Sequence, residues 1–284
     1  LASLLGIRAG LATASLMPSL ITRYDARLNL GPALVLGLSQ SGQSPDIVRT
    51  LAVARAAGAV TAAIVNDRAS PLAAAAAHVL PQHAGPELSV AATKSFIATL
   101  VAGARLVARW QDDGELLAAL DRLPERLEQA CHCDWSPALA VLAPAHSLYV
   151  VARGPGLGIA AETALKLKET SGLHAEALSA AEIRHGPRAV IDEGFPLLVY
   201  ALADPGGADA RAFAAELAAA GAAVLLASAV PGPGTQLPLP APLHPLLDPI
   251  VAVAAFYPLA AALAVARGRD PDRPRGLRKV TETV

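Results

Sequence analysis

One helical segment carries three charged residues with a spacing that suits acid–base chemistry. Glu162, Lys166 and Glu169 are separated by four and three residues within a segment, 157–170, that favours a helix. This spacing places the three side chains on one stripe of the helix. A solvated ladder of surface charges would have the same spacing, but the surrounding alanine and leucine favour a packed helix beneath a site. We therefore expect a carboxylate, partly desolvated beside a lysine, that carries protons between adjacent carbon atoms.

A serine-rich loop joins a short apolar strand, 34–38, to a helix that begins at Pro45. Free N–H groups at a helix N-terminus attract anions, and serine hydroxyls can donate to phosphate oxygens. The loop contains no lysine, so it is not a P-loop, and it suits a sugar monophosphate better than a triphosphate. The alternative is a capped turn whose serines satisfy the backbone. The loop residues are Ser39, Gln40, Ser41, Gly42, Gln43 and Ser44.

Three other polar segments could contribute to a site. The cluster 89–94 also precedes a predicted helix, where Thr93 could simply start the helix and Lys94 could be a surface charge. His185 follows a short predicted helix and is expected at an exposed helix end, where a single histidine is more often structural. The polar tail, 270–281, is either a frayed terminus or a segment that closes over an anionic ligand. The two cysteines and seven histidines show no spacing that completes a metal site.

The elements that must position these residues alternate along the chain in two series. Short apolar strands alternate with helices, which predicts an α/β fold with parallel sheets flanked by helices in three αβα layers. The predicted strands are 34–38, 60–65, 78–80, 148–152, 197–202 and 223–227, and the predicted helices are 45–57, 70–77, 90–110, 115–131, 157–170, 180–184, 209–220 and 249–266.

The two series resemble a duplication with a gap at its start. In the second series, the first two strands begin at residues 148 and 197. The same separation places the predecessor of strand 34–38 ahead of residue 1. We therefore expect the first half to lack its first strand and most of its first helix, with residues 1–5 at the end of that helix. The chain also begins without methionine and reads as part of something longer.

The composition excludes several classes of protein. Hydrophobic residues make up 54% and charged residues 17%, which is incompatible with a disordered chain. The net charge of −1 argues against a nucleic-acid partner. Two cysteines are too few for a disulfide framework, which favours a reducing cytoplasm, and no signal-peptide pattern is present. The uncharged run 249–266 is long enough to span a membrane, but its alanine content and Pro258 favour a core helix.

Four stretches of the sequence together resemble the tandem sugar isomerase (SIS) domain family. The resemblance follows the chain in the right order and covers nearly all of it. It is similar to the isomerase half of glutamine–fructose-6-phosphate aminotransferase and to SIS-type glucosamine-6-phosphate deaminases. The stretches are SQSGQSPD (39–46), SVAATKSF (89–96), AETALKLKETSGLHAEALSAAEIRHGP (161–187) and DPDRPRGLRKVT (270–281).

The resemblance implies a domain organisation and a set of binding residues. It implies a first SIS subdomain over 1–120 that is truncated at its N-terminus, a helical connector over 121–146, a second SIS subdomain over 147–266, and a tail over 267–284 that closes over the active site. It also implies that Ser39, Gln40, Ser41 and Ser44 hold the sugar phosphate, and that Val90 and Thr93 line the substrate.

The resemblance also implies catalytic roles. Glu169 would move the proton between C1 and C2 with support from Lys166. His185 would open the sugar ring and reach the site from the neighbouring subunit of a homodimer. Lys279 would close over the substrate and meet its carbonyl. No metal or organic cofactor is required for this chemistry, and neither a nucleic acid nor a membrane is expected as a partner.

The expected reaction is deamination of glucosamine 6-phosphate with water to fructose 6-phosphate and ammonia. The sequence carries no glutaminase domain, which favours a deaminase over an aminotransferase. Phosphosugar isomerisation, or deamination of galactosamine 6-phosphate, is the enzymatic alternative. The alternative from another class is a regulator that binds a phosphosugar without turnover.

Overall fold

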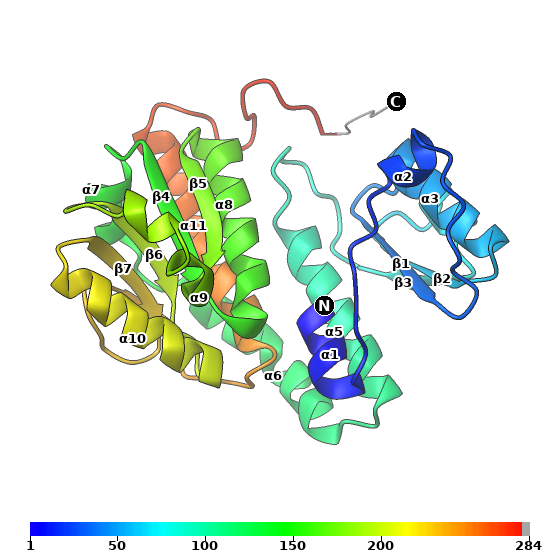
Figure 1. The fold of residues 1–284 in the computed structure, drawn as a ribbon, viewed down its shortest axis with the longest axis horizontal. Helices are drawn as coiled ribbons and strands as arrows, with labels where there is room; N and C mark the ends of the chain where they lie inside the picture. Colours follow the sequence, from blue (N-terminus) through cyan, green and yellow to red (C-terminus); the bar gives the residue numbers. More distant parts are fainter. Residues whose placement is uncertain (280–284) are drawn as a thin grey trace. The chain divides into compact units, whose positions relative to one another are not determined.

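The computed structural model describes residues 1–279 and forms two compact units (Figure 1). Among the described residues, unit 1 comprises Leu1–Gln111 together with 276–279, and unit 2 comprises Asp112–Arg275. Residues 280–284 of the predicted tail lie outside the described residues. The boundary between the two units, after Gln111, therefore lies on the N-terminal side of the boundary predicted at residue 120. That predicted boundary falls inside helix α6 (Gly114–Cys131), and the predicted tail is shared, with residues 267–275 in unit 2.

Unit 1 is built on a parallel sheet of three strands in the order β1-β2-β3. Pro45 and Pro71 begin the helices that follow β1 and β2, because proline suits the first turn of a helix. The elements are α1 (Ala2–Ala9), α2 (Ser19–Thr22), β1 (Leu34–Ser39), α3 (Pro45–Ala56), β2 (Val60–Val65), α4 (Pro71–Ala75), β3 (His78–Pro81) and α5 (Lys94–Trp110).

Unit 2 contains a parallel sheet of five strands in the order β5-β4-β6-β7-β8. Two of its strands, β5 and β8, were not predicted. Helix α6, predicted as part of a connector, packs on α11 and belongs to this unit. Besides α6, the elements are α7 (Leu139–Leu142), β4 (Ser147–Ala152), α8 (Leu157–Ser171), β5 (His174–Ser179), α9 (Ala180–Ile183), β6 (Pro196–Tyr200), α10 (Pro205–Ala219), β7 (Ala223–Ser228), β8 (Thr235–Pro238) and α11 (Asp248–Ala266), with 3₁₀ turns at Ser136–Ala138, Gly154–Gly156 and Pro187–Val190.

Helices cover both faces of the unit 2 sheet. Val199 packs with Phe213 of α10 on one face. On the other face the next residue, Tyr200, forms a 2.7 Å hydrogen bond with Thr163 of α8, because successive strand residues point in opposite directions. Helix α11 lies against α8 and α6, and 67% of its most apolar window is buried. This helix is long and apolar enough to cross a membrane, but in the structure it packs as a core helix.

The predicted duplication is visible as a repeat of 162 residues. Gly10 ends α1 and Gly172 ends α8, both in the left-handed conformation, and strands β1 and β6 begin at Leu34 and Pro196. In the described part of unit 1, no strand pairs with the outer edge of β1. Residues 12–17, the counterpart of β5, also form no strand. In unit 2, β5 pairs only with β4, and the described part of unit 1 shows no strand in the position of β4.

Candidate functional site

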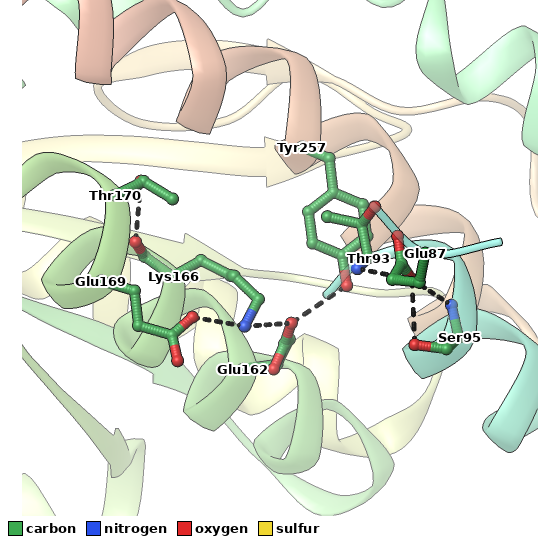
Figure 2. A network of polar contacts seen from close by, with 8 residues as sticks. All are labelled: Glu87, Thr93, Ser95, Glu162, Lys166, Glu169, Thr170 and Tyr257. Atoms are coloured by element: carbon green, nitrogen blue, oxygen red, sulfur yellow. Dashed lines mark hydrogen bonds and ion pairs between the residues drawn. The ribbon is translucent and has the colours of Figure 1, made fainter. Parts of the chain in front are cut away.

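Glu162, Lys166 and Glu169 form a buried charged cluster on α8, called here the α8 triad (Figure 2). The Lys166 ammonium lies 2.6 Å from a carboxylate oxygen of Glu169 and 3.4 Å from one of Glu162. The side chains of Glu162 and Lys166 are each 6% exposed, whereas that of Glu169 is 22% exposed. The triad is therefore no solvated ladder: two members are packed in the interior and the third reaches the surface.

Tyr257, on α11, completes the cluster from a distant part of the chain. Its hydroxyl donates a 3.1 Å hydrogen bond to the same Glu162 oxygen that faces Lys166. Burial raises the pKa of Glu162 from its usual 4.5 to about 7, although Lys166 and the Tyr257 hydroxyl both act to lower it. Glu162 can therefore gain or lose a proton near neutral pH, and Lys166 links it to the more exposed Glu169.

The serine loop, Ser39–Ser44, lies between β1 and α3 in unit 1. The Ser39 hydroxyl oxygen accepts from the Gly42 N–H at 2.9 Å, and the Ser41 oxygen accepts from the Gln43 N–H at 3.3 Å. The two hydroxyls thus satisfy the backbone, as the capped-turn interpretation predicts. Each hydroxyl still has its own proton to donate, so the same turn also suits an anion. The Ser44 side chain caps no N–H group of α3.

Gly42 gives the loop its shape. It has φ +65° and its Cα faces Ser70, the residue that caps α4. A Cβ at this position would lie 2.6 Å from the Ser70 Cβ. The buried amide of Gln82 supports the start of the loop by donating to the Ser39 carbonyl at 3.0 Å. Only glycine therefore fits this turn without displacing the neighbouring cap.

The second predicted cluster, 89–94, is organised by a residue that the sequence analysis missed. Buried Glu87 accepts hydrogen bonds from the N–H groups of Thr93 and Ser95, at 3.2 and 2.8 Å, and from the Ser95 hydroxyl at 2.9 Å (Figure 2). Its carboxylate thus occupies the N-terminus of α5. An anionic ligand is disfavoured there by like charge, which leaves α3 as the better anion site in unit 1. The sequence signal for this capping role of Glu87 was its position, a few residues before the predicted start of a helix.

The remaining predicted site residues are placed separately. Val90 and Thr93 are half-buried, and the Lys279 ammonium donates to the carbonyl of Ser89, next to Val90. In unit 2, His185 is exposed two residues after the end of α9, near the helix end where it was expected. In the described residues no hydrogen bond or ion pair joins the His185 side chain to the α8 triad. The structure thus groups the triad with Tyr257, and Lys279 with the 89–93 segment.

The described side chains contain no group of three or more histidine, cysteine, aspartate or glutamate residues placed to hold an ion. The described site residues offer carboxylates, a lysine and a histidine for acid–base transfer, and hydroxyl and backbone donors for an anion.

Known proteins are similar to this chain in both sequence and fold. The model of the SIS domain family matches residues 22–109 and 141–227, more than half of the chain. The glutamine–fructose-6-phosphate aminotransferase (isomerizing) of Zymomonas mobilis is 37% identical over 275 residues, which cover 90% of this chain. The match covers 45% of that enzyme, so the chain spans about half the length of the curated relatives it resembles.

Two solved structures illustrate the similarity of this fold to known proteins. A protein of Silicibacter pomeroyi DSS-3 assigned as a phosphosugar isomerase has a TM-score of 0.90 and 44% identity, with 95% of this chain and 83% of that chain covered. A glucosamine-6-phosphate deaminase of Thermotoga maritima has a TM-score of 0.75 at 19% identity, covers 99% of this chain and 85% of its own, and shares the fold. With both SIS repeats matched and the fold reproduced across nearly its whole length, the chain belongs to the SIS domain family.

Proposed function

We propose that this chain catalyses proton transfer between C1 and C2 of a phosphosugar, and that its reaction is deamination. Glucosamine 6-phosphate and water would give fructose 6-phosphate and ammonia. The observation that carries the proposal is the α8 triad, in which a buried carboxyl of pKa about 7 is linked through Lys166 to a partly exposed carboxylate. The names of the relatives support a phosphosugar substrate, since they concern fructose 6-phosphate and phosphosugar isomerisation.

In this proposal the serine loop binds the phosphate of the sugar. The hydroxyl protons of Ser39, Ser41 and Ser44 and the N–H groups at the start of α3 donate to phosphate oxygens. Gln40 lies in the same turn, and Val90 and Thr93 line the sugar. Binding energy from the phosphate, which does not react, then holds C1 and C2 in place for the chemical step.

The proposed reaction begins with ring opening by His185, contributed across the interface of a homodimer. Glu169 removes the proton from C2 of the open-chain aldehyde while O1 takes up a proton, which gives an enolamine. Glu169 then returns a proton to C1 and the nitrogen loses one, so that C1 becomes a hydroxymethyl group and C2 a ketimine. Water adds to the ketimine carbon and ammonia leaves, which yields the ketone of fructose 6-phosphate. Lys166 holds Glu169 in position, and Lys279 closes over the substrate.

Simple aldose–ketose isomerisation is the second candidate. It is favoured by the 44% identity to the structure assigned as a phosphosugar isomerase. The two reactions share the proton transfer and differ only in whether an amino group is lost from C2. Deuterium incorporation at C1 of fructose 6-phosphate in heavy water, read by NMR, reports the shared step.

The experiment that tests the proposal measures ammonia release from glucosamine 6-phosphate and from galactosamine 6-phosphate. The matched variants are Glu169→Gln and, as a control, Glu128→Gln, an exposed carboxylate of α6. We expect ammonia release from glucosamine 6-phosphate, a loss of at least about 100-fold in kcat for Glu169→Gln, and retained fructose 6-phosphate binding. Unchanged turnover in Glu169→Gln would refute the mechanism. Binding without deuterium exchange or ammonia release would identify a non-catalytic phosphosugar-binding protein.

A further inference from the structure

A cavity of about 400 Å³ lies at the C-terminal ends of α8 and α11, and its lining is strongly basic. This volume falls in the range of small-molecule sites. The cavity touches Thr170 of α8 but none of the three residues of the α8 triad. We call it the basic cavity, and its lining residues are Thr170, Arg267, Gly268, Arg269, Asp270, Arg273, Pro274 and Arg275.

Two of its arginines lie against backbone groups of unit 2. Arg267 donates to the carbonyl of Ser171 at 3.0 Å, and also to the carbonyls of Ala143 and Ala145 at 2.7 and 2.9 Å. The Arg269 guanidinium contacts the Cα side of Gly172, where a Cβ would clash with it. Gly172 thus ends α8, and its lack of a side chain leaves room for the Arg269 guanidinium.

The other two arginines flank a buried proline. Arg273 and Arg275 are exposed on either side of Pro274, whose burial anchors the segment between them. With the residues that the structure describes, the side chains of Arg269, Arg273 and Arg275 form no hydrogen bond or ion pair. Helix capping therefore explains Arg267, whereas the guanidinium groups of Arg269, Arg273 and Arg275 make no hydrogen bond or ion pair with the described residues.

The charge of the lining is unbalanced. Four guanidinium groups face one carboxylate, that of Asp270, so the cavity carries three net positive charges. One oxygen of Asp270 already accepts from the Asp272 N–H at 2.9 Å. The four arginines border one hollow and do not lie apart on the surface. An anion with several acceptor oxygens would offset their mutual repulsion.

We propose that the basic cavity binds a diphosphate group, through the paired oxygens of its two phosphates and the guanidinium groups of Arg269, Arg273 and Arg275. A diphosphate carries about three negative charges near neutral pH and offers the oxygen pairs that guanidinium forks bind in parallel. The ligand is either free pyrophosphate or a compound that contains a diphosphate, such as a nucleotide. This site is independent of the proposed deaminase reaction.

The test is a calorimetric titration of pyrophosphate, and in a second arm ADP, into the full chain. Saturating fructose 6-phosphate is present throughout, so that the serine loop is occupied, and the readout requires no turnover. The variants are Arg269→Gln and Arg273→Gln, with Arg109→Gln as the control. Arg109 is an exposed residue of α5 outside the cavity, so it matches the lost charge without touching the site.

We expect one equivalent of pyrophosphate or ADP per chain and a Kd about tenfold or more higher in both cavity variants, with no change in Arg109→Gln. Tighter binding of ADP than of pyrophosphate would assign the diphosphate to a nucleotide, and equal binding would assign it to the free anion. The proposal fails if the unmodified chain binds neither probe, if Arg273→Gln binds like the unmodified chain, or if Arg109→Gln weakens binding equally. Melting curves of each variant show that it is folded.

Discussion

Glu162 is expected to lower the stability of the folded chain as the pH rises, and Glu162→Gln is expected to remove this effect. The pKa of this carboxyl is about 7 in the folded state and 4.5 in its usual environment. As the pH rises from about 4.5 to about 7, the unfolded chain releases the proton first, so the free energy of unfolding falls through this window and then levels off. At 1.36 kcal/mol per pKa unit, the fall amounts to about 3 kcal/mol.

Glutamine keeps the shape of the side chain and cannot ionise. Its oxygen can still accept from the Tyr257 hydroxyl, and Lys166 keeps its 2.6 Å partner Glu169. We therefore expect Glu162→Gln and the unmodified chain to be about equally stable at pH 4.5. The variant is expected to be more stable by about 3 kcal/mol at pH 8 and above.

The assay is urea unfolding followed by circular dichroism from pH 4.5 to 9. Glu128→Gln is the matched control, because Glu128 is exposed on α6 and its replacement should leave the pH dependence unchanged. A stability difference between Glu162→Gln and the unmodified chain that does not vary with pH would refute the raised pKa of Glu162. A difference that grows as the pH falls would refute the sign of the argument.

Two further predictions concern Gly42 and Tyr257. Gly42→Ala should lower the free energy of unfolding by about 2–5 kcal/mol, because alanine at this position adopts a left-handed backbone and also clashes with Ser70. The control is Gly85→Ala, since Gly85 has φ +67° and open space around it. In the same urea assay this control should lower the free energy of unfolding by only about 1–2 kcal/mol. Equal losses in the two variants would contradict the clash. Tyr257→Phe removes a hydrogen bond that lowers the pKa of Glu162, so carboxyl ¹³C NMR should find that pKa above about 7, and an unchanged or lower value would contradict the network.

Local signals in the sequence were sufficient for most of the fold. The apolar strands and the proline and glycine positions predicted α3, α8, α11 and the strands around the serine loop to within a few residues. Strand β5 was not predicted because its sequence, HAEALS, lies at the edge of the sheet, is only partly buried and lacks an apolar run. The corresponding residues 12–17 form no strand, and in the described part of unit 1 no strand pairs with the outer edge of β1.

The spacing of Glu162, Lys166 and Glu169 on one helix stripe was determined by the sequence alone, because helix geometry is local. Their burial was decided by tertiary structure. Helix α11, nearly a hundred residues later, covers the stripe and brings the Tyr257 hydroxyl to Glu162, and this desolvation moves the pKa. Likewise, the sequence predicted the serine loop as an anion site. The N-terminus of α5 was a second candidate, and only the structure shows that the Glu87 carboxylate occupies it by accepting from the N–H groups of Thr93 and Ser95.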